Sequence, residues 1–212
     1  MGAMRRLFLT GLMVVLWVVG CGRQPDYFPL AKGAVRVMKV YERRVVGADT
    51  SETTQVRVVE AVLGEKEVPG LGKVWVVEAP LDSGGSTRYF YQMRPDSVLK
   101  FVPGRGGRPE QMLFLLMPLK VGKKWYESDK EREVSEVVAN EPVAVAAGTF
   151  PSCFKVVTTA ARVDLKVESW LAPGVGVVKR DKRLTWMQDS VRHELFSSEE
   201  LVEYRVVKPR TR

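Results

Sequence analysis

The sequence predicts a mainly β protein, with a single domain of antiparallel strands that form a curved sheet or half-barrel and with little helix. Short runs rich in Val, Tyr, Phe and Trp recur along the chain. Gly, Pro, Asn and Asp separate these runs at intervals of about 8 to 12 residues, which is typical of an antiparallel all-β fold. No segment keeps an apolar i, i+3, i+4 pattern over about twelve residues, so long amphipathic helices are not expected.

The strand-like runs follow one another without a long break. They cover residues 34–46, 53–63, 73–80, 86–95, 97–103, 111–118, 154–161, 164–173, 176–181, 184–190 and 201–207. The best helical candidate is 197–204, where Ser residues precede acidic ones, but it is short and runs into the last strand-like segment.

The N-terminus has the three parts of a bacterial lipoprotein signal. Arg5 and Arg6 precede the apolar run 7–19, which leads through Gly20 to Cys21. A run of this length is short for a membrane span, which needs about twenty residues, and it fits the apolar part of a secretory signal. The residues before Cys21 resemble the lipobox, which implies cleavage at that cysteine and acylation of it.

We therefore expect residues 1–20 to be a signal peptide, 21–26 a lipidated N-terminus with a short linker, and 27–212 a single β domain. Acyl chains on Cys21 would hold the domain on a bilayer. Gly22 stands where an Asp tends to retain enterobacterial lipoproteins at the inner membrane, so we expect the periplasmic face of the outer membrane. An uncleaved anchor or an ordinary signal peptide is the alternative for this N-terminus.

Candidate catalytic residues are few. The chain has two cysteines and one histidine, so with Cys21 acylated it lacks a Cys or His cluster for zinc. Cys153 would need His193 to act as a nucleophile, and a buried, inert thiol is the simpler expectation. There is no G-x-S-x-G elbow for a serine triad. The acids of 126–136 alternate with Lys and Arg, which is typical of a solvated loop.

Glycine-rich and aromatic motifs also favour structural roles. Neither 70–72, 104–107 nor the Gly-Val-Gly at 174–176 matches a phosphate-binding loop, so we expect turns there. The tryptophans Trp75, Trp125, Trp170 and Trp186 fall in candidate strands and are expected to pack the core. The alternative is that one or two of them line a concave groove for a hydrophobic ligand.

The net charge of +8 becomes +6 once the two signal arginines are removed. Basic residues gather at 103–109, 178–183 and 208–212. Nucleic acid is not an expected partner for an exported lipoprotein. Anionic headgroups or cell-wall polymers could attract such clusters, at about 1 kcal/mol per residue close to a charged surface, but a solvated basic face is the simpler expectation.

A short repetition suggests that the sheet has two related parts. Pro-Leu-x-x-Gly occurs at 29–33 and again at 118–122, each time just before a strand-like run. Pro and Gly would shape a turn that feeds the strand. A true duplication and a chance recurrence both remain open at this point.

Four motifs, at 27–33, 117–125, 147–156 and 170–179, resemble the DUF3108 and TapB-like families of exported bacterial envelope proteins. The resemblance covers most of the mature chain, although the family's aromatic residue soon after Gly33 is missing. It implies no catalytic residues and no cofactor. We therefore expect a non-enzymatic, lipid-anchored binding or scaffolding protein. The alternatives are a periplasmic carrier of lipid or another hydrophobic ligand in a concave cavity, and a hydrolase using Cys153.

Overall fold

The computed structural model describes residues 26–80, 85–102, 104, 109–128, 133–161 and 163–205, and within these ranges it contains strands and turns but no helix. The strands are β1 (Val35–Val46), β2 (Asp49–Val68), β3 (Gly72–Pro80), β4 (Ser86–Met93), β5 (Ser97–Val102), β6 (Glu110–Leu116), β7 (Lys124–Ser128), β8 (Glu133–Val145), β9 (Gly148–Ala160), β10 (Asp164–Ala172), β11 (Gly176–Gln188) and β12 (Val191–Arg205). The predicted signal peptide 1–20 and the predicted lipid anchor Cys21 lie outside the described residues.

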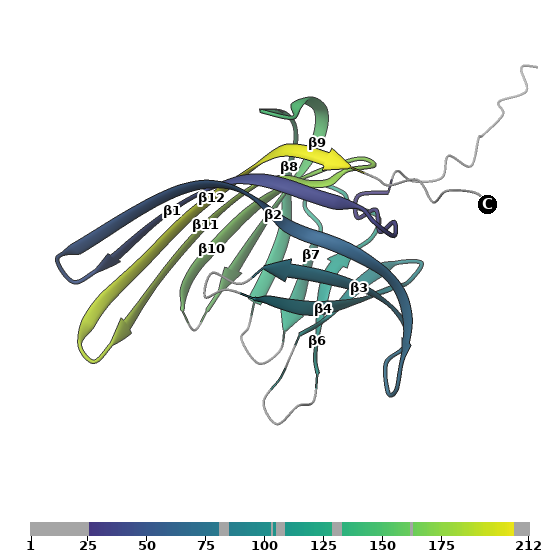
Figure 1. The fold of residues 1–212 in the computed structure, drawn as a ribbon, viewed down its shortest axis with the longest axis horizontal. Coiled ribbons are helices and arrows are strands. Elements are labelled where there is room, and N and C mark those ends of the chain that lie inside the picture. Colours follow the sequence, from purple (N-terminus) through teal and green to yellow (C-terminus); the bar gives the residue numbers. More distant parts are fainter. Residues whose placement is uncertain are drawn as a thin grey trace, which may run out of the picture.

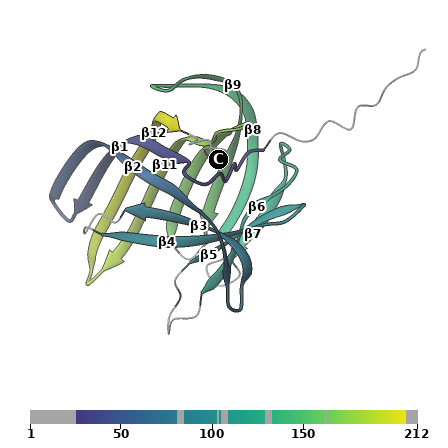
Figure 2. The ribbon, with the colours of Figure 1, turned by 45° about the vertical axis from the view of Figure 1, so that its right-hand side comes forward.

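All of these strands form one antiparallel sheet, with the order β6-β5-β4-β3-β2-β1-β12-β11-β10-β9-β8-β7. The first and last strands pair along the whole of β1, which places the two sheet edges at β6 and β7. These two edge strands lie beside each other, so the sheet curls into a nearly closed barrel (Figures 1 and 2). The prediction of a single, curved, antiparallel β domain is confirmed.

Local patterns misjudged several segments. Strands β7 and β8 were missed, because Glu, Asn and Ala weaken the strand-like composition of 133–145. The acids at 126–128 and 133–136, expected in a solvated loop, lie in these two strands. The run 176–181 and most of the run 184–190 belong to one continuous strand, β11, and residues 189–190 form the turn to β12. The helical candidate 197–204 lies inside β12, where hydrogen bonding to β1 and β11 on both sides overrides the local preference.

The interior of the curled sheet is packed with apolar side chains. Strands β2 to β11 each contribute to one buried cluster, and the segment 27–34 enters it from the N-terminal side. The ring of Phe28 lies 4.8 Å from that of Tyr91 and 5.1 Å from that of Phe114. Burying such a cluster supplies the main favourable free energy of folding.

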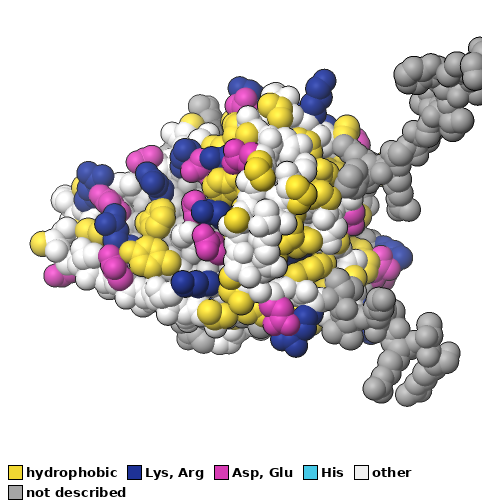
Figure 3. Space-filling model, turned by 90° about the horizontal axis from the view of Figure 1, so that it is seen from above, with side chains coloured by type: hydrophobic (Ala, Val, Ile, Leu, Met, Phe, Trp, Pro, Cys, Tyr) yellow, Lys and Arg dark blue, Asp and Glu magenta, His cyan; other side chains and the backbone are white. Residues whose placement is uncertain are grey.

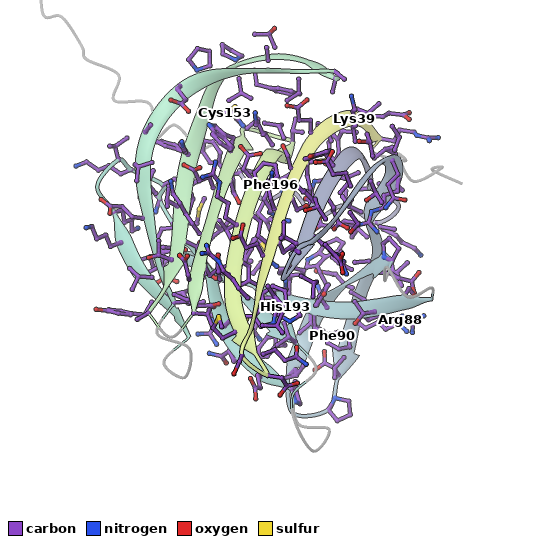
Figure 4. All side chains as sticks on the ribbon, turned by 90° about the vertical axis from the view of Figure 1, so that its left-hand side faces the viewer. Lys39, Arg88, Phe90, Cys153, His193 and Phe196 are labelled. Carbon is purple, nitrogen blue, oxygen red and sulfur yellow. The ribbon has the colours of Figure 1, made fainter. Side chains whose placement is uncertain are left out.

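A second buried cluster forms where the β8–β9 hairpin bends over the sheet (Figures 2 and 4). It includes Met38, Trp170 and Leu201, with Phe150 packed against it. The N–H of Ala147, at the tip of the hairpin, donates to the carbonyl of Leu201 at 2.9 Å. This contact holds the hairpin over β12.

The two Pro-Leu-x-x-Gly motifs occupy equivalent places. One precedes β1 and the other β7, the first strands of the two six-strand halves of the sheet. Gly33 N donates to Val62 O at 2.8 Å, and Gly122 N donates to Val137 O at 2.7 Å. Val62 N and Val137 N in turn donate to the carbonyl of the residue after each glycine, at 2.8 and 2.9 Å. The two turns therefore start the two halves with the same hydrogen bonds.

Both turn glycines have positive φ, 82° for Gly33 and 87° for Gly122. Replacing Gly122 by Ala should lower the free energy of unfolding by about 1–2 kcal/mol, the cost of a left-handed residue with a Cβ. No atom lies within 4 Å of the new Cβ, so the loss should come from backbone strain. Denaturant titration would measure it. Val121→Ala, at the neighbouring exposed position, should change stability by less than about 0.5 kcal/mol, and equal effects of both variants would contradict this account.

Candidate functional site

A group of charged side chains meets inside the curled sheet, in contact with the aromatic part of the core. These side chains come from six different strands and interact electrostatically with one another. We call them the inner polar cluster, and its members are Arg36, Glu60, Lys100, Glu127, Arg180 and Glu199. Since buried charges are costly unless they are paired, each member's partners indicate what the cluster can do.

Arg36 and Glu60 are direct cross-strand neighbours on β1 and β2, and they form an ion pair. The Arg36 side chain is 5% exposed, and its Nε and Nη2 atoms also donate to Val175 O at 3.3 and 3.2 Å. Burial raises the pKa of Glu60, but the neighbouring cations, with Arg36 foremost, outweigh burial and hold that pKa below its usual range. The pair is therefore ionised at neutral pH.

Arg180 and Glu199 face each other on β11 and β12. Their hydrogen bond is long, 3.4 Å from Arg180 Nη1 to Glu199 Oε2, and Arg180 Nε donates to Ser169 Oγ at 3.4 Å. Burial lowers the pKa of Arg180, but Glu199 and Glu60 outweigh it and raise that pKa. Weak hydrogen bonds thus hold this guanidinium in place, and some of its five N–H groups can still donate to another acceptor.

Lys100 contacts aromatic rings instead of a carboxylate. Its Nζ lies 4.1 Å from the ring centroid of Tyr89 and 5.9 Å from those of Tyr91 and Phe114. Among the described residues it makes no hydrogen bond or ion pair. Burial lowers the pKa of Lys100, and the nearby Arg180 adds to that effect while Glu60 opposes it.

Glu127 is a buried carboxyl group of the inner polar cluster. Burial raises its pKa, although hydrogen bonds from Ser135 and Thr158 partly offset that effect. Thr158 Oγ1 lies 3.1 Å from Glu127 Oε1, and Ser135 Oγ lies 2.5 Å from Thr158 Oγ1. The three side chains form one small network on β7, β8 and β9.

A pocket of about 200 Å³ opens beside the inner polar cluster. Three cations and two carboxylates line it together with aromatic and small apolar side chains: Arg57, Val59, Glu60, Ala79, Pro80, Tyr89, Tyr91, Lys100, Phe114, Arg180 and Glu199. It is smaller than the 300–1,000 Å³ typical of sites for drug-sized ligands. Its chemistry suits a small polar or charged molecule better than an acyl chain.

The structure separates the predicted candidates for thiol catalysis. Cys153 is fully buried in the second apolar cluster, and burial, followed by the negative charge of Glu141, raises its pKa to about 11. His193 lies at the other end of the sheet, where its ring stacks on Trp186 at 4.9 Å (Figure 4). The thiol is therefore protonated at neutral pH and has no imidazole beside it.

The four tryptophans do not line one groove. Trp125 belongs to the first apolar cluster, with Trp75 packed against it, and Trp170 belongs to the second. Trp186 lies near the end of β11. The core role is thus confirmed for Trp125 and Trp170, and the interior pocket found here has no tryptophan in its wall.

The outer surface carries two shallow depressions of about 420 and 410 Å³ that meet at Tyr41 and Phe196. On the face of the molecule drawn in Figure 3, hydrophobic side chains are mixed with charges of both signs. The basic run 178–183 is partly neutralised, since Lys179 pairs with Glu200 at 3.5 Å and Arg180 with Glu199. Of the other two basic clusters, 208–212 and most of 103–109 lie outside the described residues.

The described residues hold no cluster of three His, Cys, Asp or Glu side chains arranged to bind a metal ion. They also contain no apolar helix with the length to span a bilayer.

No family model matches the chain, and no curated protein matches it. One solved structure, described as "a putative lipoprotein" from Parabacteroides distasonis, is 17% identical with a TM-score of 0.47, over 86% of this chain and 100% of the other. The resemblance to the DUF3108 and TapB-like families stays a prediction.

The Arg36–Glu60 pair should be important for stability. Arg36→Met leaves Glu60 charged and buried without its partner, so it should cost about 3–5 kcal/mol of unfolding free energy. Chemical denaturation would measure the loss. Lys73→Met removes one partner of an exposed ion pair with Glu65 and should cost less than about 1 kcal/mol. If Arg36→Met costs no more than Lys73→Met, the pair has no such role.

Cys153 should resist alkylation in the folded protein. Iodoacetamide at pH 8 should leave this thiol unmodified until denaturant is added, because it is buried and its pKa is about 11. Peptide mass spectrometry would locate the label. The thiol introduced by Thr149→Cys, at an exposed position on the same strand, should react in the native state. Equally fast labelling of Cys153 would restore the hydrolase alternative.

Proposed function

We propose that this chain is a lipid-anchored protein of the bacterial cell envelope, whose β domain acts by binding or scaffolding and not by catalysis. The observation that carries the anchor is the arrangement of Arg5 and Arg6, the apolar run 7–19 and Cys21. A diacylated or triacylated Cys21 would keep the domain on the bilayer, where one acyl chain would give only marginal binding.

The proposed location is the periplasmic face of the outer membrane, since Gly22 and not Asp follows the anchor cysteine. In such an oxidising compartment a lone thiol is safest when it is buried. The complete burial of Cys153 supports this location. Membership of the DUF3108 and TapB-like families remains part of the proposal, chiefly on the motifs at 147–156 and 170–179.

A binding role is supported by the interior of the β domain. The inner polar cluster keeps charges at high cost inside an otherwise apolar core, and a pocket opens beside them. Charged side chains that are buried although the fold does not need them for stability are often found at ligand-binding sites. The raised pKa of Cys153 favours binding over thiol chemistry.

A carrier of lipid or another hydrophobic ligand is the weaker proposal. It would need a largely apolar cavity, whereas five charged side chains line the interior pocket. The segment 27–34 and the aromatic rings around it fill the neighbouring space. We therefore favour a small polar ligand or an envelope protein as the partner.

Lipidation is tested in the intact cell. Radiolabelled palmitate should be incorporated into the wild-type protein, and Cys21→Ala should abolish both the label and the cleavage of the signal. Cys153→Ala is the matched control and should be labelled like the wild type, because its thiol lies in the core. Labelling that persists in Cys21→Ala would disprove the anchor.

A further inference from the structure

We propose that the interior pocket binds a small organic anion, with its carboxylate at Lys100 and Arg180 and its apolar part on the aromatic wall that includes Tyr91 and Phe114. This inference rests on the binding role proposed above and gives that role a ligand class. It is carried by the charge balance of the pocket, by the contacts of Lys100, and by the size and composition of the wall.

The charge balance of the pocket favours an anion. Its lining holds three cations and two carboxylates. One of these carboxylates, Glu60, is already paired with Arg36, a fourth cation. The other carboxylate, Glu199, is paired with Arg180, whereas Lys100 has no carboxylate partner among the described residues. A single bound negative charge would therefore lower the cost of burying this ammonium.

Lys100 supplies the contact that an anion would complete. Its ammonium lies on the ring of Tyr89 and has no carboxylate or carbonyl partner among the described residues. Cation–π contacts satisfy an ammonium only in part, since an aromatic face attracts the positive charge but offers no oxygen to accept its N–H hydrogen bonds. A carboxylate oxygen would supply the charge-assisted hydrogen bond that is missing.

Arg180 can act as the second donor. Both of its hydrogen bonds, to Ser169 and to Glu199, are 3.4 Å long. A planar guanidinium can bind a carboxylate with two parallel hydrogen bonds, which are stronger than these contacts. Glu199 keeps the guanidinium near the pocket without saturating it.

The aromatic wall and the size of the pocket determine which apolar group can accompany the carboxylate of the ligand. Tyr89, Tyr91 and Phe114 provide aromatic surface beside the two cations. A volume of about 200 Å³ lies below the range of sites for drug-sized ligands. We therefore expect it to admit one ring with one carboxylate and not a long acyl chain.

Benzoate is a suitable probe, tested by isothermal titration calorimetry on the full chain purified in detergent. We expect a dissociation constant between about 10 µM and 1 mM, which is ordinary for so small a ligand. Benzamide has the same shape without the charge and should not bind. If benzoate does not bind, or if benzamide binds equally well, the proposal is wrong.

Lys100→Met keeps the apolar stem and removes the charge. It should weaken benzoate binding at least tenfold, while Lys39→Met, at an exposed lysine of β1, should change it less than twofold. Thermal unfolding should show that Lys100→Met is as stable as the wild type, because a costly buried charge has been removed. Unchanged affinity in Lys100→Met would overturn the assignment.

A titration with inorganic phosphate tests whether the pocket prefers an anion with a ring over an anion without one. It should bind more weakly than benzoate, since it cannot use the aromatic wall. Phosphate binding as tight as that of benzoate would overturn the ring-bearing class. If none of these ligands binds, the proposed lipid anchor is unaffected, because palmitate labelling at Cys21 does not depend on Lys100.

Discussion

The buried ion pair between Arg36 and Glu60 is the contact on which the interior depends. Arg36 donates to Val175 O, which lies in the turn before β11, and its guanidinium lies 5.9 Å from the ring of Phe28 and 5.8 Å from that of Tyr204. It thus ties the N-terminal segment and both halves of the sheet together. The space around it is tight, because a Cβ at Gly176 would lie 2.5 Å from Arg36 Nη2.

The halves of the sheet share more than their strand number. The same hydrogen bonds surround Gly33 and Gly122, and both bring a buried valine, Val62 or Val137, to the core. Duplication of a six-strand unit explains this correspondence, and we retain it as a proposal. The halves differ in strand length: β7 has five residues, whereas β1 has twelve.

Strand composition and turn residues were enough to predict the fold class, because alternation and Gly or Pro punctuation are local properties. The core role of Trp125 and the burial of Cys153 also followed from residue type. The inner polar cluster could not be predicted, since its members lie on six strands and only strand pairing brings Arg36 to Glu60 and Arg180 to Glu199. Lys100 gave no signal in the sequence, because nothing local distinguishes it from a solvated lysine.

The pocket beside this cluster is the central claim about function. Its charges are costly to bury, and an anion between Lys100 and the aromatic wall would offset part of that cost. The most direct measurement is a crystal structure of the protein grown with 4-bromobenzoate, using the anomalous signal of bromine. We predict a bromine peak in the interior pocket, with the carboxylate within hydrogen-bond distance of Lys100 Nζ. Bromine peaks confined to the outer surface, with none in the pocket, would contradict the account.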